Sequence, residues 1–187
     1  MHIRLARQDD ARACLDIYRP IVSGTAISFE TLVPDEDTYA GRIQSYLTFA
    51  PWLVAAEGEE VLGFAYGSRF RPRPAYQWSV EVTVYVAESA RNRGVGKALY
   101  GTLLAALRAQ GFVNAYALIT LPNSGSVALH ETMGFRKLGV LDQVGFKLGV
   151  WHDVGWWRNS LCQPPPAPNP LGKVEDAVAV ALAGPPG

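Results

Sequence analysis

The sequence predicts an α/β fold, one sheet covered by helices, and three observations support this. Segments with strand character alternate with segments of helical spacing along most of the chain. The most β-prone stretch, residues 78–86, lies near the middle, and a helical pattern over residues 94–110 follows it closely. The 187 residues, 49% of them hydrophobic, suffice for one sizeable core. We therefore expect a single globular domain.

The first half of the chain begins with a strand and a helix. Residues 2–6 read as a short strand, and Asp9 or Asp10 can cap the helix that follows. Its apolar positions are Ala13, Ile17 and Ile21, and it is broken by Pro20 and Gly24. A second helix is expected within residues 34–46, and strands at 52–57 and 61–70 around a Glu-Gly-Glu-Glu turn.

The second half continues the alternation after the central strand. Gly111 is placed to end the helix over 94–110, whose apolar residues recur four apart. Asn123 or Ser124 can cap a short helix that runs to Thr132. Strands are expected at 113–119, 135–141 and 150–157. The domain is therefore placed at residues 1–162, and the Pro/Ala-rich residues 163–187 are expected to form an extended, unpacked tail.

Bulk charge and cysteine content exclude several classes of protein. Lys plus Arg number 17 and so do Asp plus Glu, so no overall field favours nucleic acid or an anionic membrane. Cys14 and Cys162 lie far apart and outside any metal-binding spacing, which favours a reducing, cytoplasmic setting. No apolar run has the length of a signal peptide or of a membrane span. A soluble protein is expected.

The segment between the central strand and the next helix can bind an anion. It reads Arg91-Asn92-Arg93-Gly94-Val95-Gly96-Lys97. Closely spaced glycines let backbone N–H groups converge on a phosphate, and the helix N-terminus adds partial positive charge. A plain tight turn is the alternative. The third glycine of a dinucleotide fingerprint and the Gly-Lys-Ser/Thr ending of a nucleotide-triphosphate loop are both missing, so another pyrophosphate is favoured.

In this context, Arg91-x-x-Gly94-x-Gly96 resembles the acetyl-CoA pyrophosphate motif of the GNAT superfamily. Further segments are similar to phosphinothricin acetyltransferases and their methionine sulfoximine relatives: residues 80–86, Leu121-Pro122-Asn123, Leu129-His130-Glu131 and residues 149–155. The resemblance covers roughly residues 2 to 160. It implies a mixed, mostly antiparallel central sheet flanked by helices and splayed at the cofactor strand. It also implies acetyl-CoA as co-substrate.

The resemblance assigns the cofactor contacts to two consecutive segments and one later residue. The backbone of the strand would bind the pantetheine arm and thioester, and the loop would bind the pyrophosphate. The implied residues are Val84, Tyr85, Val86, Asn92, Arg93, Gly94, Val95, Gly96, Lys97 and Asn123. For Asn123, a helix N-cap is an alternative that is compatible with cofactor contact.

Two residues are candidates for acid–base chemistry. Amide formation needs a neutral amine, and Glu81 is the candidate base because it lies in an otherwise apolar and hydroxyl-bearing strand. An exposed or paired strand carboxylate is the alternative. The leaving CoA thiolate needs a proton or a donor, and the resemblance places His130 there, where many GNAT enzymes have tyrosine. A structural histidine is the alternative.

Arginines before the central strand are candidate anchors for a substrate carboxylate. Arg71, Pro72 and Arg73 lie in Arg-Pro-Arg-Pro, where proline restricts the backbone, and a fixed guanidinium grips a carboxylate through two hydrogen bonds. A solvated loop is the alternative. The relatives bind substrate at positions matching 71–73 and at Glu81, Val82 and Thr83. Adjacent His152 and Asp153 point to opposite faces of a strand, so no metal site is expected.

Together these features predict an acetyl-CoA-dependent N-acetyltransferase that acetylates the amino group of a small, amino-acid-like substrate of the phosphinothricin or methionine sulfoximine type. Direct attack is expected, since neither cysteine lies in a motif segment. Acetylation of a protein N-terminus, a polyamine or an antibiotic amine remains open, as does a non-catalytic acyl-CoA-binding module. The resemblance also implies a homodimer, with Trp151, Trp156 and Trp157 in the core or the subunit interface.

Overall fold

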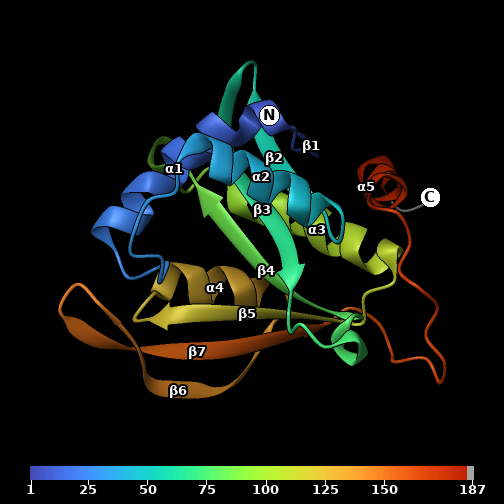
Figure 1. The fold of residues 1–187 in the computed structure, drawn as a ribbon. Coiled ribbons are helices and arrows are strands. Elements are labelled where there is room, and N and C mark those ends of the chain that lie inside the picture. The colour runs from blue at the N-terminus through green and yellow to red at the C-terminus, as the bar shows by residue number, and fades with distance from the viewer. Residues whose placement is uncertain (185–187) are drawn as a thin grey trace.

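The computed structural model describes residues 1–184, which form one sheet flanked by helices (Figure 1). The strands are β1 (His2–Leu5), β2 (Trp52–Glu57), β3 (Glu60–Arg69), β4 (Ser79–Val86), β5 (Asn114–Leu121), β6 (Arg136–Lys147) and β7 (Val150–Ser160). The helices are α1 (Ala11–Gly24), α2 (Glu36–Leu47), α3 (Val95–Gln110), α4 (Ser124–Thr132) and α5 (Val174–Ala183). The predicted elements are therefore present, with the strand at 135–141 extended to Lys147.

The sheet is mixed and mostly antiparallel, as predicted. Its strand order is β1-β2-β3-β4-β5-β7-β6, and β4 with β5 forms the parallel pair within the described residues. The loop that joins these two strands carries α3, as a parallel crossover requires. The central position predicted for residues 78–86 is confirmed, because β4 is the fourth of the seven strands.

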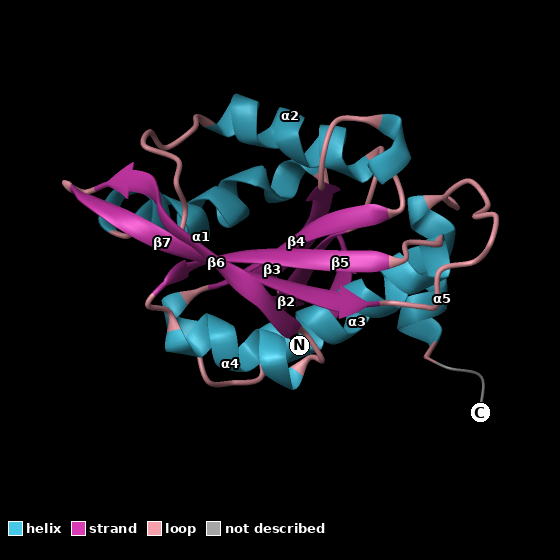
Figure 2. Cartoon of the chain, turned by 90° about the horizontal axis from the view of Figure 1, so that it is seen from below, coloured by secondary structure: helices cyan, strands magenta, loops and turns pink. Residues whose placement is uncertain are grey.

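The sheet splays between its two parallel strands. β4 pairs with β5 over three positions, from Ser79 opposite Asn114 to Glu81 opposite Tyr116. Beyond Glu81 the strands diverge into a V, which Figure 1 shows. Figure 2, a view from below, shows α1 and α2 on one side of the sheet and α3 and α4 on the other. The backbone of residues 82–86 pairs with β3 on one edge and is free of β5 on the other.

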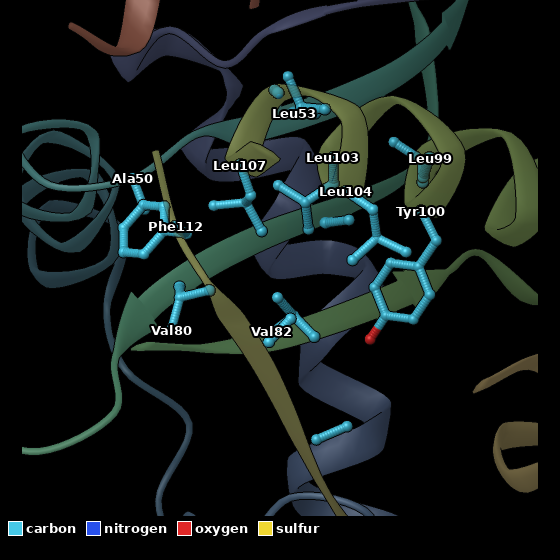
Figure 3. Close-up of a cluster of buried hydrophobic side chains, with 14 of the residues drawn as sticks. Ala50, Leu53, Val80, Val82, Leu99, Tyr100, Leu103, Leu104, Leu107 and Phe112 are labelled. Atoms are coloured by element: carbon cyan, nitrogen blue, oxygen red, sulfur yellow. The ribbon is translucent and has the colours of Figure 1, made fainter. Parts of the chain in front are cut away.

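Helices cover both faces of the sheet and bury two apolar clusters. On one face α1 and α2 pack against β2 and β3, where Trp52 and Phe64 are fully buried. On the other face the leucines of α3, with Phe112, pack on Val80 and Val82 of β4 (Figure 3). The alternation along β4 thus sends its valines to α3 and leaves Glu81 on the opposite face.

The first helix corrects the sequence analysis in its buried face and in its cap. The buried residues are Ala11, Cys14, Leu15, Tyr18, Ile21 and Val22, whereas Ala13 and Ile17 are half-buried. The predicted apolar positions therefore lie mostly at the edge of the surface that α1 buries against the sheet. Residues 11–22 contain apolar side chains on more than one face of the helix, so the sequence alone did not identify the face that is buried. Asp10 bonds Arg4 and the Arg7 N–H instead of capping the helix with its side chain.

The end of the described chain is also packed more closely than predicted. Residues 163–173 are extended, but α5 lies along α3 and buries Val174, Ala177 and Val178. The Trp78 indole N–H donates to the Asn169 carbonyl oxygen at 2.8 Å, which ties the extended segment to the domain. The expectation of an unpacked tail is thus wrong for residues 174–183, whose Ala/Val composition is apolar enough to pack on α3; residues 185–187 of that tail lie outside the described residues.

Candidate active site

A cavity of about 570 Å³ passes through the sheet where β4 and β5 diverge. Because the strands no longer pair there, side chains from both faces of the sheet line one continuous space. From the α1 face come Tyr18, Ile27, Ser28, Phe29, Glu30, Tyr66, Glu81, Thr83, Tyr85, Leu118 and Thr120, with Leu141, Val144 and Val154 from the β6–β7 hairpin. From the α3 face come Val82, Val84, Tyr100, Ile119, Asn123, Ser126 and His130.

Glu81 occupies the apex of the V, as the last β4 residue that pairs with β5. Burial raises the pKa of the Glu81 carboxyl, and the nearby Arg71 guanidinium opposes part of that rise. Within residues 1–184 the carboxylate has neither an ion-pair partner nor a hydrogen-bond donor. A carboxylate held in this way is a stronger base than an exposed one, and it faces the cavity.

His130 lies on the other side of the gap and is fully engaged by its neighbours. It is 4% exposed, and its Nδ1–H donates to the Ser126 carbonyl oxygen at 2.7 Å. Its Nε2 is therefore the acceptor for the Tyr100 hydroxyl at 2.8 Å, which Figure 3 shows directed away from α3. Burial lowers the pKa of His130, so the ring is neutral near pH 7. The alternative of a satisfied structural histidine describes these contacts equally well.

The loop between β4 and α3 presents free backbone donors. Asn92 has a φ of 61° and Gly94 a φ of 79°, and such left-handed residues turn successive N–H groups to one side. Gly94 is the N-cap of α3 and offers no side chain to the first-turn N–H groups of Val95, Gly96 and Lys97. Arg93 donates to the exposed Glu57 carboxylate at 2.9 Å. The arrangement fits a phosphate group.

Asn123 has both of the properties that its position suggested. Its side chain accepts from the Ser126 N–H at 3.1 Å, so it is the N-cap of α4, and it also lines the cavity. Gly96, at the start of α3, lies close to Leu129 of α4 and to Val86 of β4. The start of α3 therefore lies beside α4 and the free edge of β4.

Arg71, Pro72 and Arg73 lie apart from the residues that line this cavity. They border a separate hollow of about 160 Å³ beyond the end of β3, and all three side chains are exposed. The Arg71 guanidinium lies over the rings of Phe70 and Trp156, 4.5 and 5.8 Å from their centroids. Its charge reaches Glu81, as the pKa of that carboxyl shows.

The sequence marked Ser28-Phe29-Glu30-Thr31 as a loop that affects the depth of the pocket, but it could not place that loop on the α1 side of the cavity. The segment Ile27–Glu30 follows α1 without regular structure, and its Glu30 carboxylate bonds Arg42 at 2.7 Å. Leu141 and Val144 come from the other end of the chain. No spacing links these segments. Tyr100 was also missed, although its position on the buried side of α3 was readable from the helical pattern.

The Trp-His-Asp segment of β7 has structural contacts. His152 donates to the Lys147 carbonyl oxygen at 3.0 Å, and Asp153 accepts from the Gln143 N–H at 2.8 Å. Among the described residues no group of three His, Cys, Asp or Glu side chains could hold a metal ion. In the same part of the chain, no helix has the length and apolar character needed to cross a membrane.

Comparison with known proteins places this geometry among acetyltransferases. Residues 3–156 match the acetyltransferase (GNAT) domain family. The chain is 37% identical over 174 residues to phosphinothricin N-acetyltransferase of Streptomyces viridochromogenes, covering 93% of this chain and 94% of that one. It is 35% identical over 161 residues to the L-methionine sulfoximine/L-methionine sulfone acetyltransferase of Pseudomonas paraeruginosa, covering 85% and 94%.

A solved structure shows the same fold with the acyl donor bound. The GNAT superfamily phosphinothricin acetyltransferase of Sinorhizobium meliloti, in complex with acetyl-CoA, has a TM-score of 0.84. It is 34% identical and aligns with 90% of this chain and 95% of its own. The overall fold is therefore shared with that enzyme.

Proposed function

The chain belongs to the GNAT acetyltransferase family, and from this premise we propose that it transfers the acetyl group of acetyl-CoA to the amino group of a small amino-acid-like acceptor. The observation that carries the proposal is the through-sheet cavity, which has a carboxylate at its apex and phosphate-binding geometry beside it. The family supports acetyl transfer, and the relatives named above support the class of acceptor.

The residues present fit acetyl-CoA. The uncapped start of α3, with Asn92 and Gly94 in left-handed conformations, suits a pyrophosphate, with Arg93 and Lys97 nearby. The free edge of Val84–Val86 offers backbone groups to the amides of a pantetheine arm, as a strand would. When bound, acetyl-CoA supplies an activated thioester carbonyl. We propose that Asn123 contacts the same molecule from the α4 side.

We propose Glu81 as the general base. Its raised pKa, caused by burial, brings it toward that of the ammonium group it must deprotonate, and its carboxylate faces the part of the cavity enclosed by residues 27–30. The neutral amine then attacks the thioester carbonyl directly. A backbone N–H of β4 near Val84, left unpaired by the splay, would bond the negative charge that develops on the carbonyl oxygen.

His130 serves the leaving-group side in this proposal. Glu81 takes the first proton from the ammonium group and passes it to solvent. When the C–S bond breaks, the second proton that the nitrogen loses goes to the departing CoA thiolate, which becomes the free thiol. His130 and the Tyr100 hydroxyl form a hydrogen-bonded pair on the α3 side of the gap. Because the Nδ1–H of His130 is already donated to Ser126, the Tyr100 hydroxyl is the member of this pair that can turn to donate to the thiolate.

The acceptor is proposed to be an amino acid or analogue that carries a carboxylate. Arg71 and Arg73 are exposed cations in the loop after β3, and the charge of Arg71 acts on Glu81. Val82 and Thr83 line the cavity beside Glu81. The relatives named for phosphinothricin and for methionine sulfoximine act on acceptors of this kind. Polyamines and basic peptide termini would meet these arginines unfavourably.

We also propose that the chain forms a homodimer through the β6–β7 hairpin. Strand β6 is an edge of the sheet, and the hairpin exposes a run of large apolar side chains: Leu138, Val140, Leu141, Val144, Phe146, Leu148, Val150 and Trp151. Trp151 is 61% exposed, whereas Trp157 is buried in the core. Light scattering at micromolar concentration should give twice the mass of the chain, and a monomer mass would contradict the proposal.

A thiol-release assay tests the proposed function. We expect CoA release from acetyl-CoA with phosphinothricin or methionine sulfoximine as acceptor, and none with spermidine or a ribosomal-protein N-terminal peptide. Mass spectrometry of the product should show one acetyl group on the α-amine. Release with the peptide or the polyamine alone would overturn the acceptor class, and acetyl-CoA binding without release for any amine would indicate a non-catalytic module.

A further inference from the structure

A buried lysine joins the two segments that enclose the α1 side of the cavity. Lys147 closes β6, is 6% exposed, and donates from Nζ to the carbonyl oxygens of Val22 and Ser28, each at 2.6 Å. Val22 belongs to the last turn of α1, where carbonyl groups lack helical partners and carry partial negative charge. Ser28 belongs to the unstructured segment that lines the cavity. One ammonium group thus connects three parts of the chain.

The charge of Lys147 is not balanced in the way usual for a buried cation. Within residues 1–184 no carboxylate lies within ion-pair distance of it; Glu30, the nearby acid, bonds Arg42 at 2.7 Å. Burying an ammonium is costly, and an apolar side chain of similar size would fill the space without that cost. The polar contacts therefore specify the position of residues 22–28 relative to the hairpin.

The neighbouring glycine fixes the same segment by shape. A Cβ at Gly145 would overlap the ring of Phe29, so the ring lies directly on the bare backbone of β6. The Phe29 ring also lies 6.2 Å from that of His152, which in turn bonds the Lys147 carbonyl oxygen. The Ser28 hydroxyl, in turn, forms a hydrogen bond of 2.6 Å with the Tyr18 hydroxyl of α1. The segment is held from both directions.

We propose that Lys147 is a positioning residue for the acceptor. Its hydrogen bonds, together with the packing of Phe29 on Gly145, hold residues 25–33 against the β6–β7 hairpin, and we call this set of contacts the clasp. Ser28, Phe29 and Glu30 then form a fixed part of the wall of the cavity that Glu81 also lines. Only the role in binding the acceptor rests on the proposed function. The clasp itself depends only on the contacts of Lys147 and Gly145.

Matched variants of β6 test the clasp. Lys147→Met removes the ammonium, and Lys137→Met, at an exposed lysine of the same strand, is its control. Gly145→Ala displaces Phe29, and Gly139→Ala, where a Cβ meets nothing within 4 Å, is its control. We expect Lys147→Met and Gly145→Ala to raise the KM for phosphinothricin about tenfold and leave the KM for acetyl-CoA unchanged. Hydrogen exchange of residues 26–33 should accelerate about tenfold.

The two measurements separate the clasp from the enzymatic role. If the parent chain shows no acceptor activity, the proposed function fails, and hydrogen exchange alone decides the clasp. The proposal is overturned if Lys147→Met matches Lys137→Met in exchange, or if the KM values for both substrates rise together. Lys147→Arg should restore part of the acceptor affinity, and Gly145→Ala replaces Lys147→Met in both measurements if Lys147→Met does not fold.

Discussion

The two sides of the gap between β4 and β5 are built in different ways. The α3 side comes from β4 with its loop, from α3 and from α4, and its His130 uses both ring nitrogens in hydrogen bonds. The α1 side is assembled from segments more than 100 residues apart and holds a carboxylate without a partner among the described residues. We infer that the α3 side is preformed for a common donor, whereas the α1 side carries reactivity and selectivity.

The sharpest test of this contrast is Glu81→Gln. Removing the base should lower kcat/KM about 10²- to 10⁴-fold near pH 7. The deficit should shrink at high pH, where the acceptor amine is already neutral. Steady-state thiol release between pH 6 and 10 measures this, with Glu59→Gln in an exposed turn as control. Full activity of Glu81→Gln at every pH would remove Glu81 from the mechanism.

Changes on the α3 side should have a smaller effect, confined to turnover. His130→Ala should lower kcat about tenfold to a hundredfold, less than loss of the base, since a thiolate with a pKa of about 8.5 leaves without full protonation. The acceptor KM should stay constant because the ring lies across the gap from Glu81. Tyr100→Phe, which keeps the ring packing, should show part of the same loss. A rise in acceptor KM with normal kcat would place His130 in the acceptor site.

The exposed arginines should affect affinity more weakly still. Arg71→Ala and Arg73→Ala should each raise the acceptor KM about threefold to tenfold, because exposed charges are screened by solvent. The effect should be absent for an acceptor that lacks the α-carboxylate, and the KM for acetyl-CoA serves as internal control. An equal rise in KM for acceptors with and without the α-carboxylate would mean that the two arginines only maintain the structure of the loop.

The smallest expected effect is on stability. Because the folded-state pKa of Glu81 is raised, its contribution to stability is fully present below the ordinary glutamate pKa and is lost as pH rises through the raised value. Glu81→Gln should therefore raise the Tm by roughly 2–4 °C at pH 8. At pH 3.5 the gain should vanish. Thermal unfolding at both pH values measures this, and a lower Tm at pH 8 would mean that the carboxylate is stabilised.

The predictions made from sequence succeeded where structure is local. Alternating valines marked β4, and leucines four apart with a closing Gly111 marked α3. The buried face of α1 was predicted only in part: Ile21 is buried, but Ala13 and Ile17 are half-buried. The apolar residues of α1 occupy more than one face, so packing against β2 and β3 decided which of them became fully buried. The prediction of an unpacked tail was wrong because the Pro-rich composition of its first part was taken to describe the whole tail. The later part forms α5, whose apolar side chains pack on α3.

The sequence by itself determined the side of the cavity that we propose for acetyl-CoA. Closely spaced glycines, the start of a helix and the alternation of a strand are local patterns, so the loop at 92–97 and the position of Glu81 on its strand could be predicted from them. Only the tertiary structure decided the side that we propose for the acceptor. There Lys147 meets Ser28 across 119 residues, Phe29 lies on Gly145, and Arg71 to Arg73 lie outside the cavity lining. Such contacts depend on where the β6–β7 hairpin lies relative to the rest of the sheet. No regular spacing of residues along the chain predicts that position.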